Sequence, residues 1–159
     1  MSLTLVKAVR GARAYRIEEL WGFALTSMHT RPKPDWILIA NATRARVLQQ
    51  EPGSAMVVLE SFVHPAGRGQ PSEPLLDARR KECTRFAHEL ARYLEHEGRQ
   101  GHFRSLTIFA SASFLAELRA ALGKITRRLL AGLHELDLTS VGVAELEGRV
   151  SHELAAAAH

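Results

Sequence analysis

The positions of apolar residues along the chain predict alternating strands and helices. Between Ser105 and Gly123, an apolar strand from Ser105 to Ala110 is followed by a small-residue turn and an amphipathic helix. Apolar residues recur in the helix at intervals of three and four, which places them on one face. We expect Ser111 or Ser113 to cap its amino terminus and Gly123 to follow its last turn as a C′ residue. A strand that leads into a helix in this way is half of a β-α-β unit.

Three more strands are predicted upstream of this unit. They cover Trp36 to Ala40, Arg44 to Leu48 and Ala55 to His64, and residues typical of turns separate them. Two hairpins in succession form an antiparallel meander. The first of these strands is apolar throughout, which is typical of a strand that is buried on both faces.

Two further helices and one further strand complete the pattern. A long helix is predicted from Leu76 to Gly98, and a last helix begins after a cap at Thr139 or Ser140. Between them, the residues from Ile125 to Leu136 have no clear period, and we interpret Leu129 to Leu133 as a strand. The last helix is expected to turn four apolar residues inward, namely Val143, Leu146, Val150 and Leu154.

The predicted order β-β-β-α-β-α-β-α defines the fold class. Three antiparallel strands are followed by strands that crossover helices add in parallel, which gives a five-stranded mixed sheet with flanking helices. This is the ribonuclease H-like α/β architecture. We expect it to occupy residues 34–159 as a single domain. Residues 1–33 are expected to form an N-terminal extension that is poorly packed or partly helical, with a short helix across Ala14 to Leu25.

The composition is that of one globular domain. The chain has 159 residues, of which 46% are hydrophobic and 24% are charged. It contains a single cysteine, so no disulfide can form within the chain. No apolar run reaches the roughly 18 residues that span a bilayer. These features predict a cytoplasmic protein without a membrane span. The net charge of +4 is weak for a dedicated nucleic-acid-binding protein.

Several segments together resemble one protein family. WILIANATRARVL, RFAHELARYLE, FASASFLAELRAAL and HELDLT follow one another as in the bacterial family described as "protein required for attachment to host cells". The resemblance covers residues 34–154, and FLAELR after the small-residue turn is its most specific part. That family is related to the central domain of archaeal and eukaryotic class-1 peptide-chain release factors. The resemblance therefore implies a ribonuclease H-like or translation-machinery fold and a role linked to attachment.

The loop before the long helix resembles the GGQ loop of release factors. In that family a GRGGQS segment lies at this place, and its glutamine helps to position the water that attacks the peptidyl-tRNA ester. This chain has GRGQPS at residues 67–72, with one glycine fewer. Pro71 biases Gln70 toward an extended backbone and removes an amide donor. Gln70 is thus the one weak candidate for a catalytic residue. The loop is alternatively a phosphate contact, formed by Gly67, Arg68, Gly69 and Gln70, or a surface turn.

Basic residues near this loop indicate a surface for an anionic partner. Arg79, Arg80 and Lys81 open the predicted long helix, and Arg44 and Arg46 lie on the second strand. Cations at a helix amino terminus oppose the helix dipole, so helix stability does not explain them. They are candidates for contacts with phosphate groups. The alternative is a solvated surface on which these charges alternate with acidic residues.

The sequence predicts no metal, no cofactor and no DNA-specific motif. Ribonuclease H-like nucleases hold two metal ions on acidic residues of the first and fourth strands. Here Asp35 precedes the first strand and Asp137 follows the last one. Histidine–glutamate pairs recur, but none has the HExxH spacing of a zinc site. Cys83 shares the apolar face of the long helix, which favours a buried and inert thiol.

The sequence therefore favours a non-catalytic, cytoplasmic protein that binds RNA, the ribosome or a protein partner. Two alternatives stay open. One is a peptidyl-tRNA or ester hydrolase that uses Gln70 to orient water. The other is a protein-interaction module linked to attachment to host cells.

Overall fold

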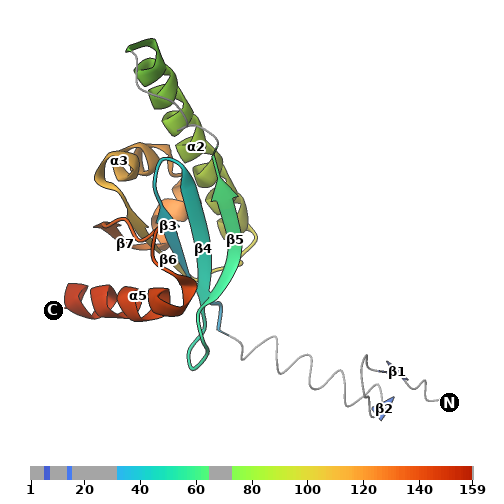
Figure 1. Cartoon of the computed structure of the whole chain (residues 1–159). Coiled ribbons are helices and arrows are strands. Elements are labelled where there is room, and N and C mark those ends of the chain that lie inside the picture. Colours follow the sequence, from blue (N-terminus) through green and yellow to red (C-terminus); the bar gives the residue numbers. More distant parts are fainter. Residues whose placement is uncertain (1–5, 8–13, 16–31, 65–72, 159) are drawn as a thin grey trace. The chain divides into compact units, whose positions relative to one another are not determined.

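The computed structural model describes residues 6–7, 14–15, 32–64 and 73–158 (Figure 1). The chain divides into two units, Met1–Pro32 and Lys33–His159. In the first unit, β1 (Val6–Lys7) and β2 (Ala14–Tyr15) pair in antiparallel orientation. The predicted helix across residues 14–25 is therefore wrong at its first two residues, because their backbone pairs with β1. The rest of that helix lies outside the described residues, and the extension over residues 1–33 stays a prediction.

The second unit is built on a five-stranded mixed sheet in the order β5-β4-β3-β6-β7 (Figure 1). Its strands are β3 (Asp35–Ala40), β4 (Arg44–Gln50), β5 (Val57–Val63), β6 (Ser105–Ala110) and β7 (Leu130–Glu135). β3, β4 and β5 are antiparallel neighbours, whereas β6 runs parallel to β3 and β7 runs parallel to β6. The predicted five-stranded mixed sheet is confirmed. Its assignment to the ribonuclease H-like architecture in particular stays a prediction.

Helices cover the sheet on both faces. The helices are α2 (Glu73–Arg99), α3 (Ala112–Ala121), α4 (Lys124–Leu129) and α5 (Val143–Ala157). One apolar cluster lies between the sheet and the helices α2 and α3, and a second lies between the sheet and α5. None of the helices in the described ranges combines the length and the apolar character needed to cross a membrane.

The central strand β3 supplies both clusters. Its Trp36, Leu38 and Ala40 belong to the cluster with α2, and its Ile37 and Ile39 belong to the cluster with α5. Successive side chains of a strand point to opposite faces, so a strand with helices on both sides must be apolar at every position. Each fully buried leucine or isoleucine contributes about 1.5–3 kcal/mol. The prediction that this strand is buried on both faces is confirmed.

The long helix begins at Glu73, three residues earlier than predicted. Arg79, Arg80 and Lys81 therefore lie beyond its first turn. The effect of the helix dipole is confined to the first and last turns. The argument that these cations oppose the dipole is therefore wrong, and they have to be assessed from their surroundings instead.

The segment after α3 differs most from the prediction. Residues 124–129 form the short helix α4, and β7 begins only at Leu130 and runs to Glu135. The strand predicted for Leu129 to Leu133 therefore starts one residue too early and ends two residues too early. Gly123 follows Leu122, the C-cap of α3, and so lies at the predicted C′ position, but its backbone is extended rather than left-handed, and it is also the N-cap of α4.

The predicted side-chain caps are also wrong. Ser111 occupies the N-cap position of α3, but its side chain makes no capping hydrogen bond. The N-cap of α5 is Gly142, while the Thr139 hydroxyl donates to Asp137 instead. Val143 was expected to face inward but is 55% exposed, whereas Leu146 and Val150 are buried as predicted.

Asp35 is the first residue of β3, so the expectation that it precedes the strand is wrong by one residue. Its carboxylate accepts hydrogen bonds from Nε and Nη2 of Arg104, at 3.1 and 2.8 Å, and from the Ser105 hydroxyl at 2.7 Å. Burial alone would raise the pKa of Asp35, but these bonds and the charge of Arg104 outweigh it and lower the pKa. The contact ties β3 to the residues that lead into β6.

Replacing Asp35 by asparagine is expected to lower the free energy of unfolding by about 1 kcal/mol at neutral pH, because weaker bonds replace charge-assisted ones. Since the folded-state pKa is lowered, this stabilisation is complete above the unfolded-state pKa and is lost as the pH falls through the folded-state pKa. Urea unfolding from neutral to acidic pH measures it. The free energies of unfolding of the parent protein and of the variant should become equal in acid. A difference between them that grows as the pH falls would show that the ion pair is not the source of the stabilisation.

Candidate functional site

The structure describes some of the candidate site residues and not others. The four residues of the glycine-rich loop, Gly67, Arg68, Gly69 and Gln70, lie outside the described residues. The other candidates lie on α2 and β4. The site is therefore built from the end of β5, where that loop begins, and from the first half of α2.

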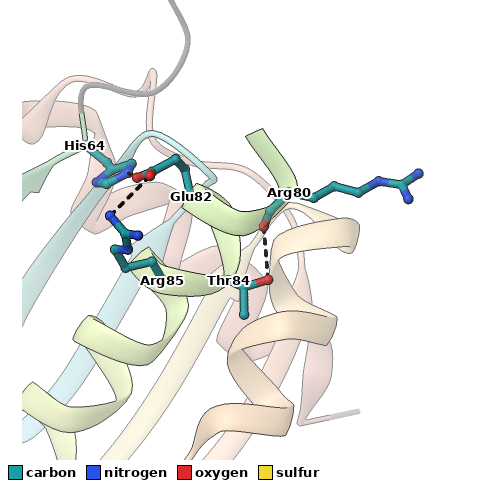
Figure 2. A network of polar contacts seen from close by, with 5 residues as sticks. All are labelled: His64, Arg80, Glu82, Thr84 and Arg85. Atoms are coloured by element: carbon teal, nitrogen blue, oxygen red, sulfur yellow. Dashed lines mark hydrogen bonds and ion pairs between the residues drawn. The ribbon is translucent and has the colours of Figure 1, made fainter. Parts of the chain in front are cut away.

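His64 fixes the end of β5 to α2 (Figure 2). Its Nε2 lies 2.7 Å from Oε2 of Glu82, and its ring stacks on Phe86 with 5.3 Å between the ring centroids. The backbone amide of His64 donates to the carbonyl of Thr43 at 2.7 Å. Only 11% of the His64 side chain is exposed. These contacts hold the first half of α2 at a fixed place beside the sheet.

Four basic residues lie close to Glu82 in the sequence of α2, and one of them, Arg85, contacts it. Nη1 of Arg85 lies 3.2 Å from the Glu82 carboxylate, and 65% of the Arg85 side chain is exposed. Arg80 and Lys81 are exposed, whereas Arg79 is partly buried. In Figure 2 the Arg80 side chain extends away from the other residues drawn. Between positions 79 and 85 the helix thus carries four cations and one carboxylate, and the carboxylate is engaged by His64.

A hollow of about 510 Å³ lies beside these cations. Its lining residues come from α2, from α3 and from the turn after β3, namely Ala42, Arg79, Arg80, Cys83, Ser113 and Glu117. Ala42 follows the end of β3, and Ser113 follows the end of β6. In open α/β sheets, ligands bind outside the carboxyl ends of the strands. The hollow occupies such a place.

Two polar contacts shape the wall of the hollow. The Thr84 hydroxyl lies 3.0 Å from the carbonyl oxygen of Arg80 and 3.3 Å from Oε2 of Glu117, so it links α2 to α3. Cys83 is only partly buried, which corrects the expectation of a buried thiol. Burial, together with the negative charge of Glu117, raises the pKa of Cys83. The thiol is therefore a weak nucleophile at neutral pH.

The two arginines of β4 do not join this surface. Arg44 and Arg46 are two residues apart on a strand and so share one face, whereas their neighbours Ala45 and Val47 face α2. Nη2 of Arg46 donates to the carbonyls of Thr139 and Val141, so it holds the segment before α5. Arg44 is exposed. The structure thus separates these two cations from those of α2.

The carboxylates considered for metal binding lie at opposite ends of the sheet. Asp35 begins β3, whereas Asp137 follows the end of β7. Asp137 accepts bonds from Asn41 Nδ2, at 3.3 Å, and from the amide of Thr139, at 2.9 Å. Burial alone would raise the pKa of Asp137, but bonds from Thr139 and Asn41 and the charge of Arg44 lower it. Within the described ranges, no three His, Cys, Asp or Glu side chains gather closely enough to hold a metal ion.

Sequence reasoning missed several residues of the site. It gave no role to His64, Thr84 or Glu117, because their partners are distant along the chain. His64 pairs with a residue 18 positions later, and Thr84 with one 33 positions later. No local pattern indicates such pairs. Only the cluster of basic residues was visible in the sequence.

Comparison with known proteins identifies the family. Residues 69–150, just over half of the chain, match the family described as "Protein required for attachment to host cells". The chain belongs to this host-attachment family. The family expected from the sequence is thus confirmed. No curated protein is significantly similar to the chain.

Two solved structures of archaeal proteins are similar to this host-attachment protein. One is titled only "Archaeal protein": it is 12% identical, with a TM-score of 0.50, and the match covers 92% of this chain and 47% of the other. The second is an archaeal translation termination factor: it is 13% identical, with a TM-score of 0.43, and the match covers 76% and 39% of the two chains. The chain thus spans less than half the length of either structure. At this identity, the first likeness shows the α/β fold alone.

Proposed function

We propose that this host-attachment protein is a non-catalytic RNA-binding protein, and that the first half of α2 supplies its binding surface. The observation that carries the proposal is the group of Arg79, Arg80, Lys81 and Arg85 on one rigidly held segment. Such a partner would place the protein in the cytoplasm. The glycine-rich loop at residues 67–70 would extend the same surface, as its position in the sequence between β5 and α2 suggests.

The chemistry of the surface favours phosphate groups. Three of its four cations are arginines, whose planar guanidinium groups bind phosphate oxygens in pairs. Glu82 is the one carboxylate among them, and its contacts with His64 and Arg85 direct it toward the sheet and its own helix. The remaining positive charge faces outward at Arg80 and Lys81. A contact of this kind binds RNA through its backbone with little dependence on sequence.

A binding role also agrees with how the acidic residues are used. Asp35, Glu95 and Asp137 each accept several hydrogen bonds that hold strands or helices in place. His64 is engaged by Glu82 in the same way. These groups contribute to the stability of the fold, and this supports a surface that binds rather than one that transforms its ligand.

The double replacement Arg80→Ala/Lys81→Ala tests the proposal on the full chain. With a single-stranded oligoribonucleotide, affinity is expected to fall about tenfold at low salt, because two phosphate contacts are lost. The slope of log K against log salt should become shallower by about 1.4, since each contact on a single strand contributes about 0.7. Fluorescence anisotropy over a salt series measures both quantities.

The control is Lys124→Ala/Arg128→Ala, which removes the same two charges from exposed positions of α4. α4 packs against α2 near Glu95, fifteen residues beyond Arg80, or about 20 Å along the helix. If both double variants lost the same affinity for the oligoribonucleotide, the loss would be explained by net charge alone, and this would contradict the proposal. Binding that does not depend on salt would contradict it too. If the protein instead hydrolyses a peptidyl-tRNA ester, and Gln70→Ala abolishes this hydrolysis, the hydrolase alternative replaces the proposed RNA-binding function.

A further inference from the structure

We infer that the hollow between α2 and α3 binds one nucleoside phosphate unit, with Arg80 at the phosphate and Glu117 at the ribose hydroxyl groups. The inference rests on the proposed function, because it assigns the 3′-terminal nucleotide of the bound RNA, whose ribose keeps both hydroxyl groups, to this hollow. The same chemistry would also accept a free nucleotide. The experiment below separates the two sources.

The size and the place of the hollow suit such a ligand. Its volume of about 510 Å³ lies within the range of pockets that enclose small molecules. It opens beyond the carboxyl ends of β3 and β6, which are parallel neighbours. On the other side of β3 the neighbouring strand β4 is antiparallel, so the connectivity of the sheet changes at this point. Open α/β sheets bind their ligands at such points.

The charges of the hollow select a ligand with two kinds of polar group. Arg79 and Arg80 line it from α2, and Glu117 lines it from α3. An anion alone would satisfy the arginines and leave Glu117 without a donor from the ligand. A nucleotide satisfies both sides, since its phosphate is an acceptor for guanidinium groups and its ribose diol donates to a carboxylate. Carboxylates bind ribose hydroxyls in this way in dinucleotide-binding folds.

Glu117 is held in place for this role. The Thr84 hydroxyl lies 3.3 Å from Oε2 of Glu117, and the negative charge of Glu117 adds to the effect of burial in raising the pKa of Cys83, which lines the hollow from α2. Glu117 is otherwise exposed on the surface of α3. The Thr84 hydroxyl lies beside one oxygen of this carboxylate, and a carboxylate has further lone pairs that can accept hydrogen bonds from a ligand.

Cys83 supplies a reporter for the test. It is the only cysteine of the chain, and it lines the hollow. A ligand in the hollow should therefore slow the modification of Cys83 by N-ethylmaleimide. The full-length protein is treated in the presence of AMP, 2′,3′-dideoxy-AMP, inorganic phosphate or a short oligoribonucleotide. Each rate is divided by the rate of the same variant without ligand, so that changes in the thiol itself cancel.

AMP or the oligoribonucleotide should protect Cys83, and the dideoxy compound should need about a tenfold higher concentration, because hydrogen bonds to Glu117 are lost. Arg80→Ala and Glu117→Ala should each weaken protection by about tenfold. Arg92 is an exposed residue of α2 that does not line the hollow, so Arg92→Ala should leave the protection of Cys83 unchanged. Protection by AMP alone supports a free nucleotide as the ligand, and protection by the oligoribonucleotide alone supports one nucleotide of an RNA chain.

The inference is overturned if neither compound slows the modification, or if inorganic phosphate protects as well as AMP. It is also overturned if Arg92→Ala weakens protection as much as Glu117→Ala does. Its failure is distinct from that of the proposed function. Salt-dependent RNA binding without protection of Cys83 removes the inference and leaves the proposed function, whereas protection by AMP without RNA binding removes the proposed function and leaves a nucleotide site.

Discussion

Replacing Glu95 by alanine is expected to lower the free energy of unfolding by about 3 kcal/mol, because it leaves several buried donors without an acceptor. Glu95 lies on α2, yet its carboxylate caps α4. It accepts hydrogen bonds from the amides of Ile125 and Thr126, at 3.1 and 2.9 Å, and from the Thr126 hydroxyl at 2.8 Å. Thr126 is fully buried, so water cannot replace the lost acceptor there.

Chemical denaturation measures this loss, and Glu89→Ala is the matched control. Glu89 is an exposed residue of the same helix, so its replacement should change the free energy of unfolding by less than about 0.5 kcal/mol. The comparison separates the cap from any general effect of removing a glutamate from α2. If both variants lost equal stability, the cap would not be the cause.

The effect of Glu95→Ala should also depend on pH. Burial alone would raise the pKa of Glu95, but the hydrogen bonds from Thr126 and Ile125 and the charge of Arg99 outweigh it and lower the pKa. A lowered pKa in the folded state means that the charged carboxylate stabilises the fold above the unfolded-state pKa. This contribution is lost as the pH falls through the folded-state pKa, so the variant and the parent protein should become more alike in acid.

Local patterns were sufficient to predict most of the sheet. β3 and β6 are short and apolar at nearly every position, and both strands were predicted to within one residue of their ends. The helix α3 was predicted as well, because Phe114, Leu115 and Leu118 recur at helical spacing and all three are buried. In these elements the local preference and the tertiary environment agree, which is why the sequence alone was informative.

α4 could not be predicted in the same way. Its six residues have no amphipathic period, and its amino terminus is stabilised by a carboxylate that lies 31 positions earlier in the chain. A helix of this length is not stable alone. The cap that stabilises it exists only after α2 and α4 have packed together. Local propensity therefore favoured a strand at Leu129, where the tertiary contact favours a helix.

The candidate site was predictable in its charge and not in its shape. The run of Arg79, Arg80 and Lys81 is visible in the sequence, but the hollow also needs Glu117 from α3. The separation of Arg46 from these cations was within reach of sequence reasoning. Its neighbour Val47 is apolar, and alternation along a strand assigns the two residues to opposite faces. The pairing of His64 with Glu82 was out of reach, since no local rule connects them.

Gly123→Ala is expected to destabilise the fold through a contact rather than through its backbone. The φ angle of Gly123 is −75°, which any residue can adopt. A Cβ atom at this position, however, would lie 2.4 Å from Cδ and Oε2 of Glu95. The Glu95 side chain can move away only by giving up its bonds to α4. We therefore expect a loss of about 2 kcal/mol, which should not exceed that of Glu95→Ala.

Gly142→Ala is the control for this prediction. Gly142 is also the N-cap of a helix with an extended backbone, and a Cβ atom there would have no neighbour within 4 Å. Alanine is less favourable than glycine at an N-cap, and this cost is the same in both variants. The difference between their losses in free energy of unfolding therefore measures the contact with Glu95. Equal losses in the two variants would mean that Glu95 can move aside and still cap α4.

The double variant Glu95→Ala/Gly123→Ala measures how far the effect of each residue depends on the other. Once the Glu95 carboxylate is absent, the alanine at position 123 has room, and it should cost no more than Gly142→Ala does. The two single losses would then not add, and their coupling should be about as large as the excess loss of Gly123→Ala over Gly142→Ala. Additive losses would instead show that the glycine and the carboxylate act independently. The small residue between α3 and α4 is thus explained by a side chain of α2, and the cycle measures that dependence.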